Sequence, residues 1–116
     1  MPRKPRQLVD DGCYHLIARG HNRIFIFNIE SGFELFKELL AHSKIKFRWK
    51  LHHYCLMGNH IHLLGKLECG NDLPDLMQYL LFEYSRWYRK RARYLGHLWQ
   101  GRYKSPLIEK ESYFLE

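Results

Sequence analysis

The first regular pattern in the chain is a run of aromatic and branched residues that predicts a β-strand. Residues 13–19 read Cys-Tyr-His-Leu-Ile-Ala-Arg, a composition typical of strands. The polar residues 20–23 interrupt this strand, and the apolar residues 24–27 are candidates for its continuation.

Apolar residues recur at helical spacing after Ser31. Phe33, Phe36 and Leu39 fall on one face of such a helix. Ser31 and Glu34 have the spacing of a capping box, in which each side chain binds the backbone N–H of the other residue. We therefore expect a helix over residues 32–44.

Two further strands are predicted on either side of Gly58 and Asn59. Residues 47–57 are rich in apolar side chains, although polar residues interrupt them, and residues 60–67 form the next apolar run. Gly58 and Asn59 both tolerate a positive φ, which suits a tight turn. The short connection predicts an antiparallel hairpin.

A long amphipathic pattern then predicts a second helix over residues 73–93. Asp72 is a candidate N-cap, and Pro74 suits the first turn of the helix. We expect the apolar stripe of this helix to pack in the core, and it consists of Leu73, Leu76, Leu80, Tyr84 and Trp87. Residues 102–109 are predicted to form the last strand, in which Pro106 indicates an edge position.

This order of elements predicts the α+β, ferredoxin-like plan β-α-β-β-α-β. Its four-stranded antiparallel sheet carries two helices on one face and leaves the other face open for a site. The length of 116 residues suits a single domain over residues 1–116. Residues 1–11 are expected to form a basic arm, and residues 111–116 look like the start of a C-terminal helix.

The charge balance favours an anionic partner. The chain carries 19 Lys and Arg against 12 Asp and Glu, and nucleic acid is the commonest partner of small basic domains. No apolar run approaches the length of a membrane span, so we expect no membrane contact. The cysteines, an odd number without a Cys-x-x-Cys pair, fit a reducing cytoplasm, and we expect a cytoplasmic protein.

The histidine pair His60 and His62 is the clearest candidate site. Side chains alternate along a strand, so both imidazoles point to one face while Ile61 points to the other. Two imidazoles so placed can reach one cation. An alternative is a structural zinc site in which His52 or His53 joins the pair.

Three segments of the chain resemble segments of the single-tyrosine, His-hydrophobic-His (HUH) transposases. These are the insertion-sequence-200-like transposases, with their REP-associated branch. Residues 57–64 (Met-Gly-Asn-His-Ile-His-Leu-Leu) resemble the His-hydrophobic-His motif, with Gly58 where many relatives have proline. Residues 98–105 (Leu-Trp-Gln-Gly-Arg-Tyr-Lys-Ser) resemble the Gln-Gly-Arg-aromatic-Lys-Ser segment of the REP-associated branch. Residues 14–23 are similar to the first strand of the family and the turn after it.

The resemblance implies an enzyme of DNA transposition and recombination. It would cleave and rejoin single-stranded DNA beside a hairpin, usually as a homodimer. His60 and His62 would hold a divalent metal, magnesium or manganese, that polarises the scissile phosphate. A tyrosine hydroxyl would attack, leaving a 5′-phosphotyrosine link and a free 3′-hydroxyl. Magnesium prefers oxygen ligands, so phosphate, water and a third protein ligand would complete its shell.

The resemblance places the attacking tyrosine on a helix after the last strand. Tyr113 begins such a helix, but it matches an earlier aromatic position, and the family's nucleophile would fall almost two turns later, beyond Glu116. Tyr113 is therefore a candidate substitute nucleophile, or else a packing residue. We expect this 116-residue chain to bind DNA and metal but to cleave poorly or not at all.

The residues expected to contact DNA phosphates are basic and lie on the second helix and in the segment after it. They are Arg86, Arg89, Arg91, Arg93, Arg102 and Lys104. The alternative function is a binding module that holds single-stranded nucleic acid without cutting it, as a degenerate transposase would. Tyr14, Tyr54 and Tyr103 are its candidates for stacking on bases.

Overall fold

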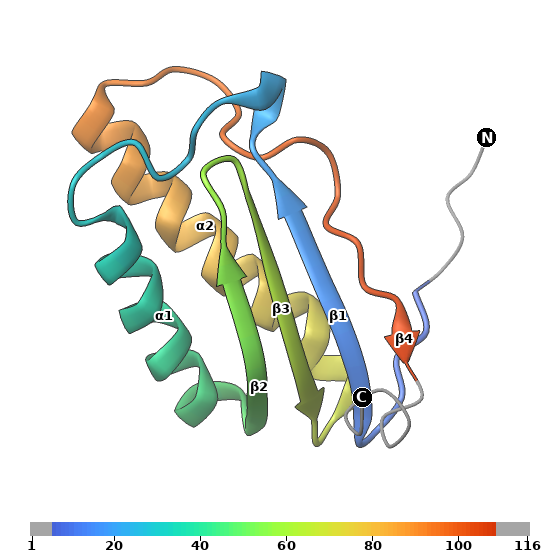
Figure 1. Ribbon diagram of the computed structural model, residues 1–116. Helices are drawn as coiled ribbons and strands as arrows, with labels where there is room; N and C mark the ends of the chain where they lie inside the picture. Colours follow the sequence, from blue (N-terminus) through green and yellow to red (C-terminus); the bar gives the residue numbers. More distant parts are fainter. Residues whose placement is uncertain (1–5, 109–116) are drawn as a thin grey trace.

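The computed structural model describes residues 6–108, which form an antiparallel sheet covered on one face by two helices (Figure 1). The main elements in chain order are β1 (Gly12–Arg19), α1 (Gly32–Phe47), β2 (Trp49–Leu56), β3 (His60–Leu67), α2 (Leu73–Ala92) and β4 (Leu107–Ile108). The strands lie in the order β2-β3-β1-β4, each antiparallel to its neighbour. This arrangement confirms the predicted ferredoxin-like plan.

The core lies between the sheet and the helices. Alternate residues of the central strands face it, among them Leu16 of β1 and Ile61 of β3, both fully buried. The predicted stripe of α2, which Met77, Leu81 and Tyr88 were expected to widen, packs against them, with Trp87 and Leu81 only partly buried. Full burial of each such aliphatic side chain contributes roughly 1.5–3 kcal/mol. No helix of residues 6–108 covers the opposite face of the sheet (Figure 1).

Ser31 and Asp72 occupy the N-cap positions predicted for them, but neither makes the predicted capping hydrogen bond. Ser31 has a left-handed backbone (φ 81°, ψ −7°) and makes no side-chain capping bond. Asp72 has helical angles and makes none either, because the 3-10 turn Gly70–Asp72 runs directly into α2. A capping side chain reaches the first turn from an extended backbone, which neither residue has. Pro74 does lie in the first turn, as predicted.

The segment after β1 does not continue the strand. A 3-10 turn, His21–Arg23, ends it, with positive φ at Asn22 and Arg23. Ile26 and Phe27 instead pack in the core, Phe27 against Phe36 of α1 and Tyr84 of α2, whereas Phe25 is exposed. The Tyr84 hydroxyl donates a hydrogen bond to the Ile26 carbonyl and anchors this segment to α2.

The turn between β2 and β3 forms where predicted but by a different geometry. Neither Gly58 nor Asn59 has a positive φ, so the conformational freedom that we invoked for them is not used. The Met57 N–H donates to the His60 carbonyl at 2.8 Å and closes the hairpin.

The last strand begins later than predicted. Of the described residues, only Leu107 and Ile108 pair with β1 as a strand, and the chain before them follows β1 and Gly20 through single bridges at Lys104 and Trp99 (Figure 1). Pro106 has no N–H to donate, and Gly101 has a φ of 59°, so a continuous ladder is interrupted. The edge position of this segment is confirmed.

Several predictions fall on residues that the structure does not describe. Residues 1–5 of the basic arm, Glu109, and the whole segment 111–116 with Tyr113 lie outside the described range. Within residues 6–108, neither helix is long and apolar enough to cross a membrane.

Candidate functional site

The histidine pair lies on the open face of the sheet, as the alternation predicted. His60 and His62 are the first and third residues of β3, and their ring centroids lie 4.8 Å apart. Ile61 between them is fully buried on the helix side. The two imidazoles are therefore neighbours that remain accessible to a ligand.

His15 joins the pair from the neighbouring strand, and our sequence analysis did not find it. Its Nε2 atom lies 3.0 Å from Nδ1 of His62. The strands β1 and β3 are adjacent, with Ile17 opposite His62 and His15 two residues away on the same face. The contact depends on the pairing of β1 with β3, which the sequence analysis did not specify.

The surroundings of His62 favour its neutral form. Partial burial is the main cause that lowers the pKa of His62 below its usual value, and the charges of His60, His15 and Arg19 lower it further. Neutral imidazole is the form that coordinates a metal.

The donor atoms of the pair fit a metal ligand set. Nδ1 of His60 lies 2.7 Å from Oδ1 of Asn59, and Nδ1 of His62 is occupied by His15. Within residues 6–108, Nε2 of neither His60 nor His62 makes a hydrogen bond. A ligating histidine usually donates its second ring N–H in this way, which fixes the tautomer that presents the other nitrogen.

No third ligand completes the pair in the part of the chain that the structure describes. Residues 6–108 contain no group of three or more His, Cys, Asp or Glu side chains arranged to hold a metal ion. The zinc set with His52 or His53 is therefore not formed there. His53 pairs with Leu64, and His52 lies at the irregularity in the β2–β3 pairing.

Backbone hydrogen bonds fix the end of the sheet where the histidines lie. The Gly20 N–H donates to the Asn59 carbonyl at 2.8 Å, which ties the end of β1 to the hairpin turn. The Gln100 N–H donates to the Arg19 carbonyl at 2.8 Å. A side chain at Gly20 would meet the Ile24 carbonyl at 2.6 Å, so the close approach of these segments requires glycine.

The predicted phosphate-binding residues fall into two separate groups. Arg102 and Lys104 line the edge of the sheet beside β1, on the same side as Ile17 and Arg19. The helix residues belong to the last turns of α2 and its C-cap, in the layer behind the sheet (Figure 1). Of these, Arg86 forms an ion pair with Glu83, and the Arg91 guanidinium lies 5.8 Å from the Trp87 ring. Arg89 and Arg93 are exposed.

The proposed stacking tyrosines are not equally available. Tyr14 is fully buried, and its hydroxyl accepts a hydrogen bond from the Val9 N–H, so it cannot stack on a base. The Arg6 guanidinium covers one face of Tyr103 at 3.7 Å from the ring centre. Tyr54 is 49% exposed. The predicted platform of three tyrosines is therefore not formed.

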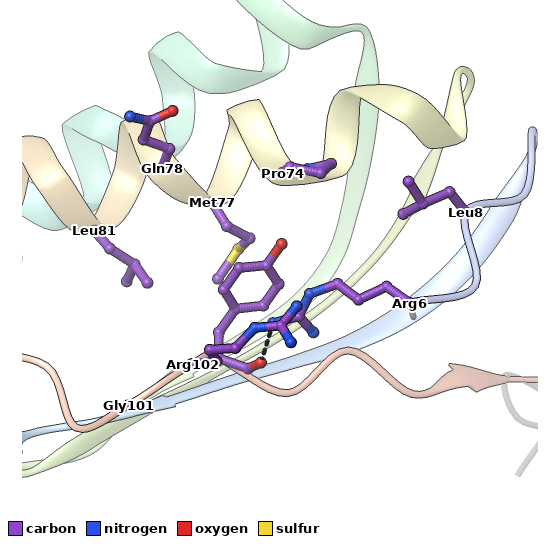
Figure 2. Close-up of a pocket in the computed structure, with 9 residues that line it drawn as sticks. Arg6, Leu8, Pro74, Met77, Gln78, Leu81, Gly101 and Arg102 are labelled. Carbon is purple, nitrogen blue, oxygen red and sulfur yellow. Dashed lines mark hydrogen bonds between the residues drawn. The ribbon is translucent and has the colours of Figure 1, made fainter. Parts of the chain in front are cut away.

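Tyr103 forms one wall of a cavity of about 560 Å³ between α2 and the segment 99–106 at the edge of the sheet, here called the edge segment (Figure 2). Met77 and Leu81 of α2 face Arg6 and Arg102 across it. Arg6 is held in place because it donates hydrogen bonds to the Tyr103 carbonyl at 2.6 Å and to Ser105 Oγ at 2.7 Å. Burial in this region raises the pKa of Tyr103.

Comparison with known protein families identifies the class of protein, that of transposases. The family model described as "Transposase IS200 like" matches residues 9–114, almost the whole chain. The chain therefore belongs to the IS200-like transposase family.

Solved structures share the fold. A REP-associated tyrosine transposase, solved bound to a REP hairpin, superposes with a TM-score of 0.78 at 14% identity, covering 99% of this chain and 67% of that one. A candidate transposase from Deinococcus radiodurans R1 gives a TM-score of 0.68 at 19% identity, covering 98% and 92%. No curated protein sequence matches the chain. At these identities the structural likeness is one of fold.

Proposed function

We propose that the protein binds single-stranded or hairpin DNA across the open face of its sheet. We further propose that, where a nucleophilic tyrosine is supplied, its family's chemistry, cleavage and rejoining of one strand through a 5′-phosphotyrosine link, takes place at the histidine pair. Membership of the transposase family supports the reaction class. Support for the location comes from the side-by-side imidazoles of His60 and His62, on a face that no helix of residues 6–108 covers.

A divalent metal, magnesium or manganese, would be held by Nε2 of His60 and of His62. When bound, it supplies Lewis-acid polarisation of the scissile phosphate. His15 and Asn59 contact the Nδ1 atoms and so hold both rings in orientation. Two nitrogen ligands make a weak site for so hard a cation, and phosphate and water oxygens suit its remaining positions.

In the cleavage step, a tyrosine hydroxyl attacks the phosphorus and forms a new O–P bond. The bond to the 3′ oxygen breaks, and that oxygen takes up a proton to become a free hydroxyl. Tyr113 is the candidate nucleophile within this sequence. The link conserves the phosphodiester energy, so a 3′-hydroxyl can attack it in the rejoining step.

The observation that carries the proposal is the pair of imidazoles with hydrogen-bond-free Nε2 atoms on the open face. Incubation of the full chain with labelled hairpin DNA and manganese, followed by a denaturing gel, tests the chemistry. A covalent adduct that disappears in Tyr113→Phe assigns the nucleophile to Tyr113. DNA binding without an adduct supports the second function, a single-stranded nucleic-acid-binding module. Absence of DNA binding contradicts both.

The same resemblance implies a homodimer. Light scattering coupled to size-exclusion chromatography measures the mass directly, with and without hairpin DNA. We expect a dimer mass, and a monomer under both conditions contradicts this part of the proposal.

A further inference from the structure

A small cavity on the open face lies beside the histidine pair, at the edge of the sheet. It has a volume of about 160 Å³ and is lined by Ile17, Arg19, Gln100, Arg102 and Lys104. Three of these five side chains are cationic, and they come from two segments of the chain, β1 and the edge segment before β4. The fold therefore brings Arg19 together with Arg102 and Lys104, which lie far from it in the sequence.

The backbone around this cavity is fixed on both sides. Ile17 and Lys104 exchange two hydrogen bonds, of 2.9 and 2.8 Å, and the Gln100 N–H donates to the Arg19 carbonyl at 2.8 Å. This pairing places the alternate residues 100, 102 and 104 on one side. The cationic side chains thus extend from a paired backbone and not from a free loop.

Among residues 6–108, no carboxylate forms an ion pair with the positive charges in the cavity. Across residues 6–108 the ion pairs are Lys37–Glu34, Lys66–Asp11 and Arg86–Glu83, and none involves Arg19, Arg102 or Lys104. Like charges held close together repel, and an anion between them removes that repulsion. Guanidinium groups bind phosphate oxygens in a bidentate manner, and the Gln100 amide adds a neutral donor.

The position of the cavity relates it to the histidines. Arg19 lies opposite His60, and Ile17 lies opposite His62 in the β1–β3 register. The Cβ atoms of directly opposite residues are about 5 Å apart in an antiparallel pair. An anion in the cavity therefore lies one strand away from a ligand bound by the two Nε2 atoms.

We propose that this cavity binds a phosphodiester of the DNA strand next to the phosphate held at His60 and His62, and so fixes the position of the strand on the histidine pair. Arg19, Arg102 and Lys104 supply the charge, and Gln100 supplies a neutral hydrogen bond. Arg19 and Gln100 are positioning residues that the sequence analysis did not identify. This inference rests on the proposed function, since it requires the DNA to cross the open face.

The test measures hairpin-DNA affinity of the full chain against salt, by fluorescence anisotropy, for Arg19→Ala and Arg102→Ala. Lys44→Ala, which removes one charge from α1, is the matched control. We expect each cavity variant to bind about tenfold more weakly, as expected for the loss of one charge-assisted contact. The salt slope should fall by about one per variant. Arg19→Lys and Arg102→Lys keep the charge and are expected to restore most of the slope, and circular dichroism checks that every variant is folded.

A second arm identifies the phosphate. DNA strands with one uncharged methylphosphonate at successive positions are bound to the parent and to Arg102→Ala. We expect one position, adjacent to the cleavage site, at which the methylphosphonate weakens DNA binding by the parent but does not weaken binding by Arg102→Ala any further. A titration with inorganic phosphate alone shows whether the cavity also binds the free ion. It is monitored by the NMR chemical shifts of the backbone amides of Ile17, Gln100 and Lys104. Shifts of these amides support the cavity, whereas shifts only elsewhere contradict it.

The two possible failures are distinct. A parent chain that does not bind hairpin DNA contradicts the proposed function, and the DNA assignment of the cavity with it. If the parent binds DNA but the cavity variants match Lys44→Ala in affinity and salt slope, only the proposal that the cavity binds a phosphodiester is overturned. The cavity is also overturned if no methylphosphonate position is coupled to Arg102.

Discussion

Each imidazole of the histidine pair is held through its Nδ1 atom, which leaves Nε2 to face the open side of the sheet. The alternation along β3 predicted that His60 and His62 share a face. It did not predict His15, because that contact depends on the pairing of β1 with β3. Tyr14 was misplaced for a related reason: Cys13 and Ile17 are apolar too, so the sequence of β1 did not show which face turns inward. At the residue scale, the chemistry that each side chain can do is set by its strand neighbours.

His15 gives the first prediction, because it orients a proposed ligand without being one. Replacing it with alanine frees the His62 ring, and loss of such a partner typically costs about 10–100-fold in metal affinity. Calorimetry with manganese should show this loss for His15→Ala, while His42→Ala, an exposed histidine on α1, should bind as the parent does. Equal affinity of His15→Ala and the parent would show that the His15–His62 contact plays no part in metal binding.

At the scale of elements, both helices, their first residues and the first three strands followed from the sequence pattern, whereas the capping bonds and the extent of the last strand did not. Periodicity reports which face is buried, and burial decides where Leu73 to Tyr84 lie. Caps depend on the backbone angles of one residue, and the left-handed Ser31 could not be anticipated from its identity. The pairing of the 99–106 segment is interrupted at Gly101 and Pro106, and the pattern of strand-forming residues did not predict these interruptions.

The junction of α1 and β2 gives a stability prediction. Buried Ser43 accepts a hydrogen bond from Nε1 of Trp49 at 3.0 Å and donates to the Leu40 carbonyl at 2.6 Å. Ser43→Ala leaves the buried indole N–H without an acceptor, which costs about 1–3 kcal/mol in the free energy of unfolding. Urea unfolding measures it, with Ser85→Ala on α2 as the control, expected within about 0.5 kcal/mol of the parent. A Ser43→Ala protein as stable as this control contradicts the role given to the hydroxyl.

The end of α2 gives a second prediction at this scale. Replacing Arg86, Arg89 and Arg91 with alanine removes three charges from the helix layer, and we expect weaker single-strand binding with a flatter salt dependence. Anisotropy titrations at several salt concentrations measure the slope. Because the helix lies behind the sheet, an unchanged slope would show that these cations are only a solvated helix end and that DNA stays on the open face.

At the scale of the whole molecule, the helices of residues 6–108 cover one face of the sheet and leave the other open (Figure 1). The proposed metal ligands His60 and His62 lie on the open face, since Ile61 between them is buried on the helix side. The histidine pair, His15 and the cationic cavity occupy adjacent strands there. The ferredoxin-like plan and the family were predicted from element order and three sequence segments. The proximity of Arg19 to Arg102 was not predicted, because it depends on the register between two segments that lie some 80 residues apart in the sequence.

The central claim, that His60 and His62 hold a divalent metal that also engages DNA, is tested most directly by hairpin-DNA binding with and without manganese. Anisotropy titrations would compare the parent with the double variant His60→Ala/His62→Ala, with His42→Ala as control. We predict that manganese strengthens DNA binding by the parent and by His42→Ala, and that the double variant loses this increment while keeping its metal-free affinity. The same increment in all three proteins would contradict the claim.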